Sequence, residues 1–197
     1  MTPVAALFVR QDSIYKRMPG VDAWDAERDA LLWPGGSRVV AHPPCKRWSM
    51  LNGVVLSRYP HKAEKFAWGN DGGTFAAALA AVRRNGGVLE HPAGSRAWAR
   101  FGLPRRGRAP DARGGWTAEV RQCDWWHRAE KRTWLYVVGL HPDDLPPLPP
   151  RRDYSCVVSR MPECRTVEIM GKAEREHTPP EFAAWLVELA RRCRVPA

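Results

Sequence analysis

Two short motifs in this chain combine prolines with a side chain that could act in catalysis. AHPPC ends at Cys45 and LEHP contains Glu90, and each follows a short apolar run. The prolines stiffen the turn before the thiol, and the cations Lys46 and Arg47 after it favour the nucleophilic thiolate. A carboxylate such as Glu90 suits hydrogen bonding to a base edge or proton donation. The alternatives are a buried structural cysteine, and an ion pair between Glu90 and one of the many arginines.

A third cluster, EKRT at residues 130–133, directly precedes the apolar run WLYVVG. Its cations Lys131 and Arg132 could neutralise a developing oxyanion or a phosphate group. An ordinary solvated charge cluster is the alternative interpretation of the same pattern.

The elements that must position these motifs follow from the apolar runs. Strands are predicted at residues 4–9, 21–24, 38–41, 88–90, 116–122 and 133–139. Helices are predicted at residues 12–18, 25–32, 74–84 and 178–193, and a long polar loop with a helical piece near 62–68 is predicted at 46–73. This alternation predicts an α/β, Rossmann-like fold with a mostly parallel sheet and helices on both faces. Because ligands bind at the carboxyl ends of strands in such sheets, we expect Cys45 and Glu90 to face one pyrimidine-sized pocket.

Length and composition predict a compact single domain. The chain has 197 residues, and 44% of them are hydrophobic, which is enough for a core. We expect an α/β core at 1–140, a proline-rich arm and connecting segment at 141–177, and a C-terminal helix at 178–197 that packs back on the core. Five cysteines without a CxxC pair argue against a disulfide framework and a zinc ribbon. The histidines beside the motifs match no metal-ligand spacing, so we expect no metal site.

The charge balance favours a polyanionic partner. Lys plus Arg is 31 and Asp plus Glu is 21, a net charge of +10, so DNA is the expected partner. A GC-rich genome that uses arginine wherever a cation is needed is the alternative. No apolar run reaches the roughly 18 residues of a membrane span, and the N-terminus lacks the parts of a signal peptide. We therefore expect a cytoplasmic protein without membrane contact, and its oligomeric state stays open.

In their order and spacing, the three clusters resemble the DNA cytosine-C5 methyltransferase family. That family has Pro-Pro-Cys at the end of one strand, then a helix, then Glu-Asn-Val at the end of the next strand, then Gln-x-Arg-x-Arg opening a strand. Cys45 and Glu90 are 45 positions apart (90 minus 45), close to the family's interval. The similarity is closer still to short phage-encoded methyltransferase-like proteins. These carry AHPPC, a Glu-plus-Pro turn and a Trp-His-x-x-x-Lys-x-Thr segment, matched here over residues 38–140 by AHPPC, LEHPAGS and WWHRAEKRTWLYVVG.

The resemblance implies a DNA pyrimidine C5-modifying enzyme. Cys45 would add to C6 of an extruded pyrimidine, Glu90 would hold N3 and the exocyclic amine, and Arg132 would support the O2 side or a phosphate. The residues expected to contact the base are Pro43, Pro44, Trp48, His91 and Lys131. The residues expected to hold DNA phosphates are Lys46, Arg47, Arg105, Arg106, Arg108 and Arg113.

The sequence also departs from that family. The family's methyl donor sits on a Gly-rich turn after the first strand, whereas here RQDSIY follows the first apolar run and no glycine precedes Gly20. Asp22 or Asp25 could still bind the ribose of S-adenosylmethionine, the cofactor that the family implies. His91 stands where the family has Asn, and Trp134 stands where it has its second Arg. A long target-recognition domain does not fit in 197 residues.

Two other functions compete with DNA modification. A catalytically degenerate relative would bind nucleic acid or a host protein without turnover, as a phage counter-defence (anti-restriction) factor in the host cytoplasm. Its DNA binding would survive Cys45→Ser. An enzyme on free nucleotides would instead turn over a pyrimidine monophosphate and bind DNA weakly.

Overall fold

The computed structural model describes residues 3–62, 67–158 and 168–196, and it is built around a six-stranded mixed sheet. The strands follow the order β2-β1-β3-β4-β6-β5. Their bounds are β1 Val4–Leu7, β2 Val21–Trp24, β3 Val39–Ala41, β4 Gly87–Pro92, β5 Trp116–Arg121 and β6 Arg132–Val138. β1 to β4 are parallel, and β6 is antiparallel to both β4 and β5. The carboxyl ends of β1 to β5 and the start of β6 therefore share one edge of the sheet.

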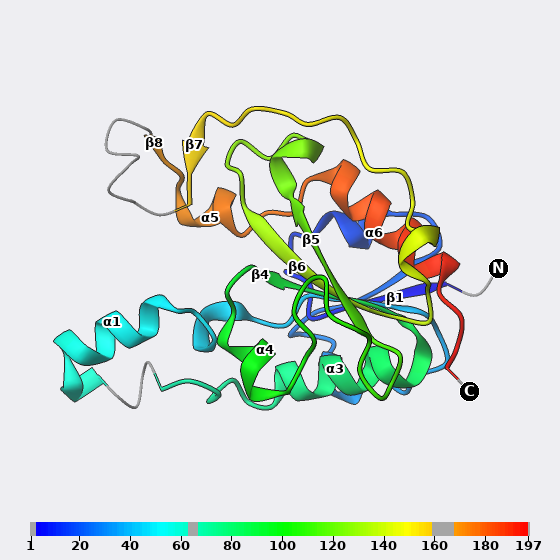
Figure 1. Cartoon of the computed structure of the whole chain (residues 1–197), viewed down its shortest axis with the longest axis horizontal. Coiled ribbons are helices and arrows are strands. Elements are labelled where there is room, and N and C mark those ends of the chain that lie inside the picture. The colour runs from blue at the N-terminus through cyan, green and yellow to red at the C-terminus, as the bar shows by residue number, and fades with distance from the viewer. Residues whose placement is uncertain (1–2, 63–66, 159–167, 197) are drawn as a thin grey trace.

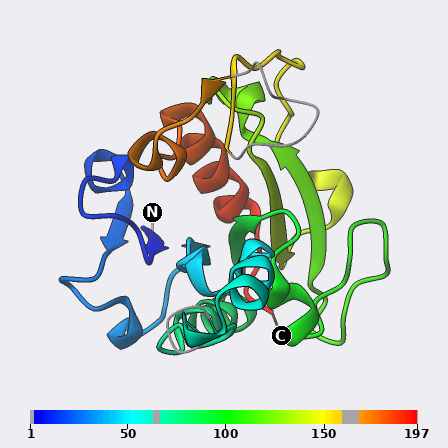
Figure 2. The same ribbon diagram turned by 90° about the vertical axis from the view of Figure 1, so that its left-hand side faces the viewer.

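Helices cover both faces of this sheet, as Figures 1 and 2 show. The α-helices are α1 Leu51–Arg58, α3 Thr74–Asn85, α4 Arg96–Arg100, α5 Lys172–Arg175 and α6 Pro180–Arg192. Short 3-10 helices occur at η1 Ile14–Arg17, η2 Ala30–Leu32, η3 Cys45–Arg47, η4 Pro60–Lys62, η5 Gln122–Trp125 and η6 Pro142–Asp144. α3 and α4 pack on one face and α6 packs on the other.

The alternation of side chains along each strand divides the core into two layers. Val88 and Leu135 face α6, where Phe182 and Leu186 meet them. Leu89 lies on the opposite face, in the layer formed with α3. The predicted α/β class with a mostly parallel sheet agrees with this architecture, and the antiparallel β5–β6 pair closes the sheet at one edge.

Several predicted elements differ from the observed ones. Only η1 forms within 12–18, and the predicted helix at 25–32 is reduced to η2, because Asp29 adopts a left-handed φ of 53°. α1 occupies part of the segment predicted as a polar loop. The helical piece predicted near 62–68 falls mainly on residues 63–66, which lie outside the described residues.

The segment predicted as a proline-rich arm runs along the core. The Trp185 indole on α6 donates to the Pro147 carbonyl at 3.0 Å, and Arg121 donates to the Arg152 carbonyl at 2.9 Å. A small parallel pair, β7 Cys156–Val157 and β8 Glu168–Ile169, follows, and α5 leads from it toward α6 (Figure 1). Among the described residues, no helix is long and apolar enough to cross a membrane.

Candidate active site

The two predicted motifs end on adjacent parallel strands at the same edge of the sheet. β3 leads through the two prolines to Cys45, which opens η3 and is exposed. β4 carries Glu90 two residues before its end, with its side chain 13% exposed. The carboxylate charge of Glu90 acts on the thiol of Cys45 and contributes to raising its pKa. Because β3 and β4 are adjacent parallel strands and His42 contacts Glu90, the turn that carries Cys45 lies at the same edge of the sheet as Glu90.

Glu90 is held by a chain of hydrogen bonds on the α6 side of the sheet. Its Oε2 lies 3.0 Å from His42 Nδ1, and His42 Nε2 lies 2.9 Å from the Tyr15 hydroxyl. Burial, followed by the charge of Glu90, raises the pKa of Tyr15 well above 10, so the phenol keeps its proton. His42 can then donate from Nδ1 to the carboxylate.

The other carboxylate oxygen is held from β5 and β6. Gln122, at the start of η5, donates from Nε2 to Glu90 Oε1 at 3.2 Å and to the Thr133 hydroxyl at 3.0 Å. Gln122 is 1% exposed, and its Oε1 has no hydrogen-bond partner among the described residues. This buried acceptor beside Glu90 was missed from sequence, because only the end of β5 at the same edge as β4 reveals it.

Opposing effects act on the ionisation of Glu90 and Cys45. Burial raises the pKa of Glu90, but the hydrogen bond and charge of His42 and the charge of Lys131 outweigh it, so the net pKa is lowered. Although Cys45 is exposed, the protein around its thiol partly desolvates it. This desolvation and then Glu90 raise the pKa of Cys45, and Lys131 partly offsets this. Glu90 is therefore an anion, and Cys45 rests as a thiol.

Lys131 is the cation that belongs to this cluster. Its ammonium donates to the His177 carbonyl at 2.9 Å. The charges of Glu90 and Cys45 both act to raise the pKa of Lys131. Burial lowers its pKa below 10.5, and its φ of 39° is left-handed, an uncommon conformation for lysine. Strained residues of this kind concentrate at functional sites.

Arg132, predicted to act beside Cys45 and Glu90, is directed elsewhere. Its guanidinium pairs with Glu119 on β5 at 2.5 Å and is 59% exposed. Neighbouring residues of a strand face opposite sides of the sheet, and Thr133 is the residue that faces Glu90. The prediction for Arg132 is therefore corrected, and Lys131 supplies the positive charge instead.

Trp48 and His91 also lie outside the cluster. Trp48 is buried, packs on Phe75 and Phe101 and donates from Nε1 to Asp71, so it is a core residue and does not wall a pocket with Cys45. His91 is buried on the α3 side, with its ring centroid 5.3 Å from that of Phe75. Burial lowers the pKa of His91 to about 4.

The remaining residues that were predicted to contact the base or DNA phosphates differ in exposure. Pro43 is buried, and Pro44 is exposed beside Cys45. Arg47 is partly buried. The exposed cations that were predicted to hold phosphates are Lys46, Arg105, Arg106, Arg108 and Arg113.

The residues after β1 and β2 do not fit a ribose-bearing methyl donor. Asp25 is buried and accepts from two backbone N–H groups, and it pairs with Lys16. Asp22 accepts from the Trp24 indole at 2.8 Å and pairs with Arg28. Both predicted ribose ligands are therefore committed within the protein, and the described turn after β1 offers no glycine to cradle a donor.

The described residues contain no group of three or more His, Cys, Asp or Glu side chains placed to hold a metal ion. Comparisons with family models, with curated proteins and with solved structures find no match to this chain.

Proposed function

We propose that this chain is a DNA pyrimidine C5-modifying enzyme in which Cys45 adds to C6 of an unstacked pyrimidine, as the resemblance to cytosine-C5 methyltransferases implies. The observation that carries the proposal is that Cys45 after β3 and Glu90 near the end of β4 meet at one edge of the sheet, because β3 and β4 are adjacent parallel strands and His42 contacts Glu90 at 3.0 Å. Lys131 reaches the same edge just before β6. The position of these residues agrees with the general location of ligand sites in doubly wound sheets, beside the point where the order β2-β1-β3-β4 reverses direction.

Each group has a defined task in this addition. Cys45 first loses its thiol proton to water. The thiolate then forms the S–C6 bond, and the electron pair of the 5,6 double bond moves to C5, which then takes a proton or an electrophile. Glu90, as an anion, accepts a hydrogen bond from the exocyclic amine of the base, and Gln122 holds the carboxylate in place. This acceptor favours cytosine, which has an amine at C4, over uracil or thymine.

Lys131 links the thiol to the base. Its charge opposes the effect of Glu90 on the pKa of Cys45 and favours the thiolate. The same ammonium can stabilise negative charge that develops on the pyrimidine during the addition. S-adenosylmethionine, the donor that the family would use, does not fit the residues after β1 and β2. The proposal therefore covers the covalent adduct with the base and names no donor of the group that C5 receives.

Covalent trapping tests the proposal without any donor. An oligonucleotide with 5-azacytosine at a mismatched position offers an electrophilic C6 and a ring nitrogen that takes the proton after addition. We expect a complex that survives denaturing electrophoresis and disappears in Cys45→Ser. Cys193→Ala is the matched control, because Cys193 is 2% exposed, follows α6 near the opposite edge of the sheet and should leave trapping unchanged. Absence of the complex with the wild-type chain would contradict the proposal.

A second function is favoured by one specific observation. Burial and Glu90 raise the pKa of Cys45, so little thiolate is present at neutral pH. A relative that binds nucleic acid without turnover, as a counter-defence factor would, needs no thiolate. Its signature is DNA binding that survives Cys45→Ser together with an unchanged nucleoside composition in cells that express the chain.

A further inference from the structure

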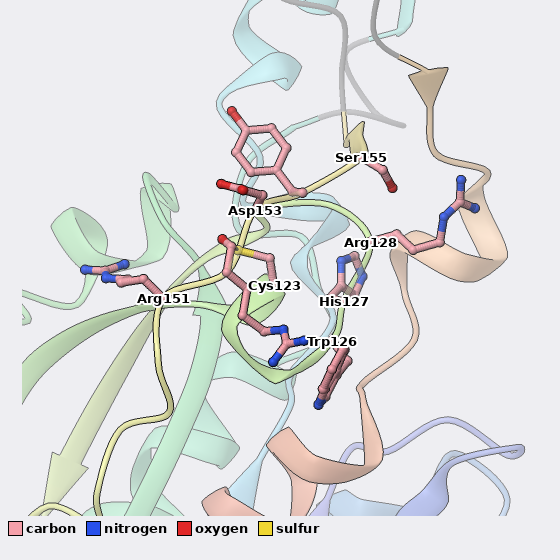
Figure 3. Close-up of a pocket in the computed structure, with 9 residues that line it drawn as sticks. Cys123, Trp126, His127, Arg128, Arg151, Asp153 and Ser155 are labelled. Atoms are coloured by element: carbon pink, nitrogen blue, oxygen red, sulfur yellow. Dashed lines mark hydrogen bonds between the residues drawn. The ribbon is translucent and has the colours of Figure 1, made fainter.

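We infer that an open pocket beside the candidate active site binds an unstacked base and the adjoining phosphates of single-stranded nucleic acid. The pocket lies between the loop that joins β5 to β6 and the end of the proline-rich segment (Figure 3). Its lining residues are Cys123, Trp126, His127, Arg128, Arg151, Arg152, Asp153, Tyr154 and Ser155. The inference rests on the proposed function and names the form of nucleic acid that this enzyme would hold.

The pocket contains a preformed stacking platform. Trp126 is 65% exposed, although an indole is among the largest apolar side chains. The guanidinium carbon of Arg152 lies 3.0 Å from the centroid of its ring, and Tyr154 is a second exposed aromatic in the lining. Nucleobases stack on both aromatic rings and guanidinium planes, so this arrangement suits a base that has left its duplex stack.

The backbone keeps Trp126 in this exposed position. Trp126 ends η5 with a φ of 71°, in the left-handed region that a bulky side chain rarely adopts. Its N–H donates to the Cys123 carbonyl at 3.0 Å, which fixes the turn. A conformation that costs free energy and exposes a large apolar ring is a feature of ligand sites.

The charges around the platform match a phosphate backbone. Arg128, Arg151 and Arg152 line the pocket with one carboxylate, Asp153, and Figure 3 shows Arg128 and Arg151 on opposite sides of it in this view. The side chain of Arg151 is 75% exposed, and that of Arg128 is 47% exposed. Arg128 pairs with the exposed Glu168 and Glu174, and such exposed pairs are weak, so phosphate oxygens can compete for its guanidinium. Arg151 pairs through one nitrogen with the buried Asp124 at 3.4 Å, and its exposed guanidinium has further N–H groups that can donate to a phosphate.

The pocket shares a sheet edge with the candidate active site. The loop from Gln122 to Lys131 joins the end of β5 to the start of β6. Gln122 at one end donates a hydrogen bond to Glu90, and Lys131 at the other end interacts with the charge of Glu90. Trp126 and Arg128 lie within this loop. A single strand held in the pocket therefore lies at the sheet edge that also carries Cys45.

Binding of fluorescent oligo-dT to the Cys45→Ser chain tests the pocket apart from any cysteine chemistry. Trp126→Gly removes the ring at a φ that glycine adopts readily, and we expect the Kd to rise about tenfold or more. Arg152→Gln should also weaken binding and reduce the slope of log Kd against log salt by about 0.7. Arg28→Gln is the matched control, because Arg28 lies 3.8 Å from the ring centroid of Trp24 at the other edge of the sheet. Its Kd should match that of the parent chain.

Three outcomes would overturn the inference. They are an unchanged Kd in Trp126→Gly and Arg152→Gln, tighter binding of a duplex than of oligo-dT, and equal competition by polyglutamate, which would indicate a site for acidic peptides. Covalent trapping with 5-azacytosine is a separate measurement. If the wild-type chain forms the covalent complex but Trp126→Gly and Arg152→Gln leave the Kd unchanged, the proposed function stands and the inferred pocket is wrong. If these substitutions weaken binding but no covalent complex forms, the pocket stands and the proposed function is wrong.

Discussion

The two faces of the sheet differ at the carboxyl ends of β3 and β4. On the α6 side, Glu90 accepts from His42 and Gln122 in a polar cluster that reaches Cys45. On the α3 side, His91 is enclosed by aromatic rings of the core. Glu90 and His91 are consecutive residues, and successive side chains of a strand point to opposite faces of the sheet. This alternation alone places Glu90 in the polar cluster and His91 in the aromatic core. Of the two neighbouring residues in the LEHP motif, one therefore belongs to the candidate site and the other to the hydrophobic core.

The largest effect should come from removing the carboxylate on the polar side. Glu90→Gln deletes the anion that accepts from His42 and from the base, and we expect trapping of 5-azacytosine to fall by about 100-fold or more. His91→Phe alters the neighbouring position on the other face and should trap at close to the wild-type rate. Rates of complex formation on denaturing gels measure both variants. Equal losses in the two variants would contradict the division between the faces.

The aromatic side should respond in stability. Trp48→Ala opens a cavity between Phe75 and Phe101, and we expect the free energy of unfolding to fall by about 3–5 kcal/mol in urea titrations. Trp126→Gly removes an exposed indole and should change it by less than about 1 kcal/mol. A small change in the free energy of unfolding for Trp48→Ala would contradict its assignment to the core and support the sequence-based prediction that Trp48 lines the pocket.

His91 should make this face sensitive to acid. Its pKa is about 4 in the folded chain and near 6.5 when unfolded, so the unfolded state binds an extra proton between these values. The free energy of unfolding should therefore fall as the pH drops from 6.5 to 4, by about 3 kcal/mol from this residue. His91→Phe should lose less stability over the same interval in urea titrations. If the free energy of unfolding has the same pH dependence in the wild-type chain and in His91→Phe, the pKa of His91 is not lowered by folding.

The smallest effect concerns the thiol itself. Because burial and Glu90 raise the pKa of Cys45, its alkylation by iodoacetamide should still increase above pH 8. At pH 8, Lys131→Gln should slow alkylation a few-fold, and Glu90→Gln should accelerate it a few-fold, since the two charges act in opposite directions. Peptide mass spectrometry at Cys45 gives these rates. A plateau below pH 7 would indicate a thiolate at rest.

Much of the scaffold could be predicted from local patterns. The strand at 21–24 and the helix that became α3 were placed within a residue, because apolar periodicity and glycine stops are local signals. The helices predicted at 12–18 and 25–32 shortened to single 3-10 helices, since Met18 is extended after η1 and the left-handed Asp29 interrupts the second segment. α1 was missed within a segment that has little apolar periodicity.

The candidate site divides in the same way. Cys45 and Glu90 could be named in advance, because each follows an apolar run and ends at a proline turn. Lys131 and Arg132 could not be told apart, since their roles depend on which face of β6 meets Glu90. Tyr15 and Gln122 were not named, because they come from separate segments that only the packed sheet brings to the carboxylate.

By itself, the amino-acid sequence determined the strands of the main sheet, the two longest helices, the excess of positive charge and the two proline-flanked motifs. These are properties of neighbouring residues, and local sterics and hydrophobic periodicity act over short stretches of chain. The tertiary structure alone decided which side of each strand faces α6, that Lys131 and not Arg132 joins Cys45, and that Trp126 stays exposed beside Arg152. Those outcomes depend on strand register and on contacts between distant segments, which no local pattern encodes.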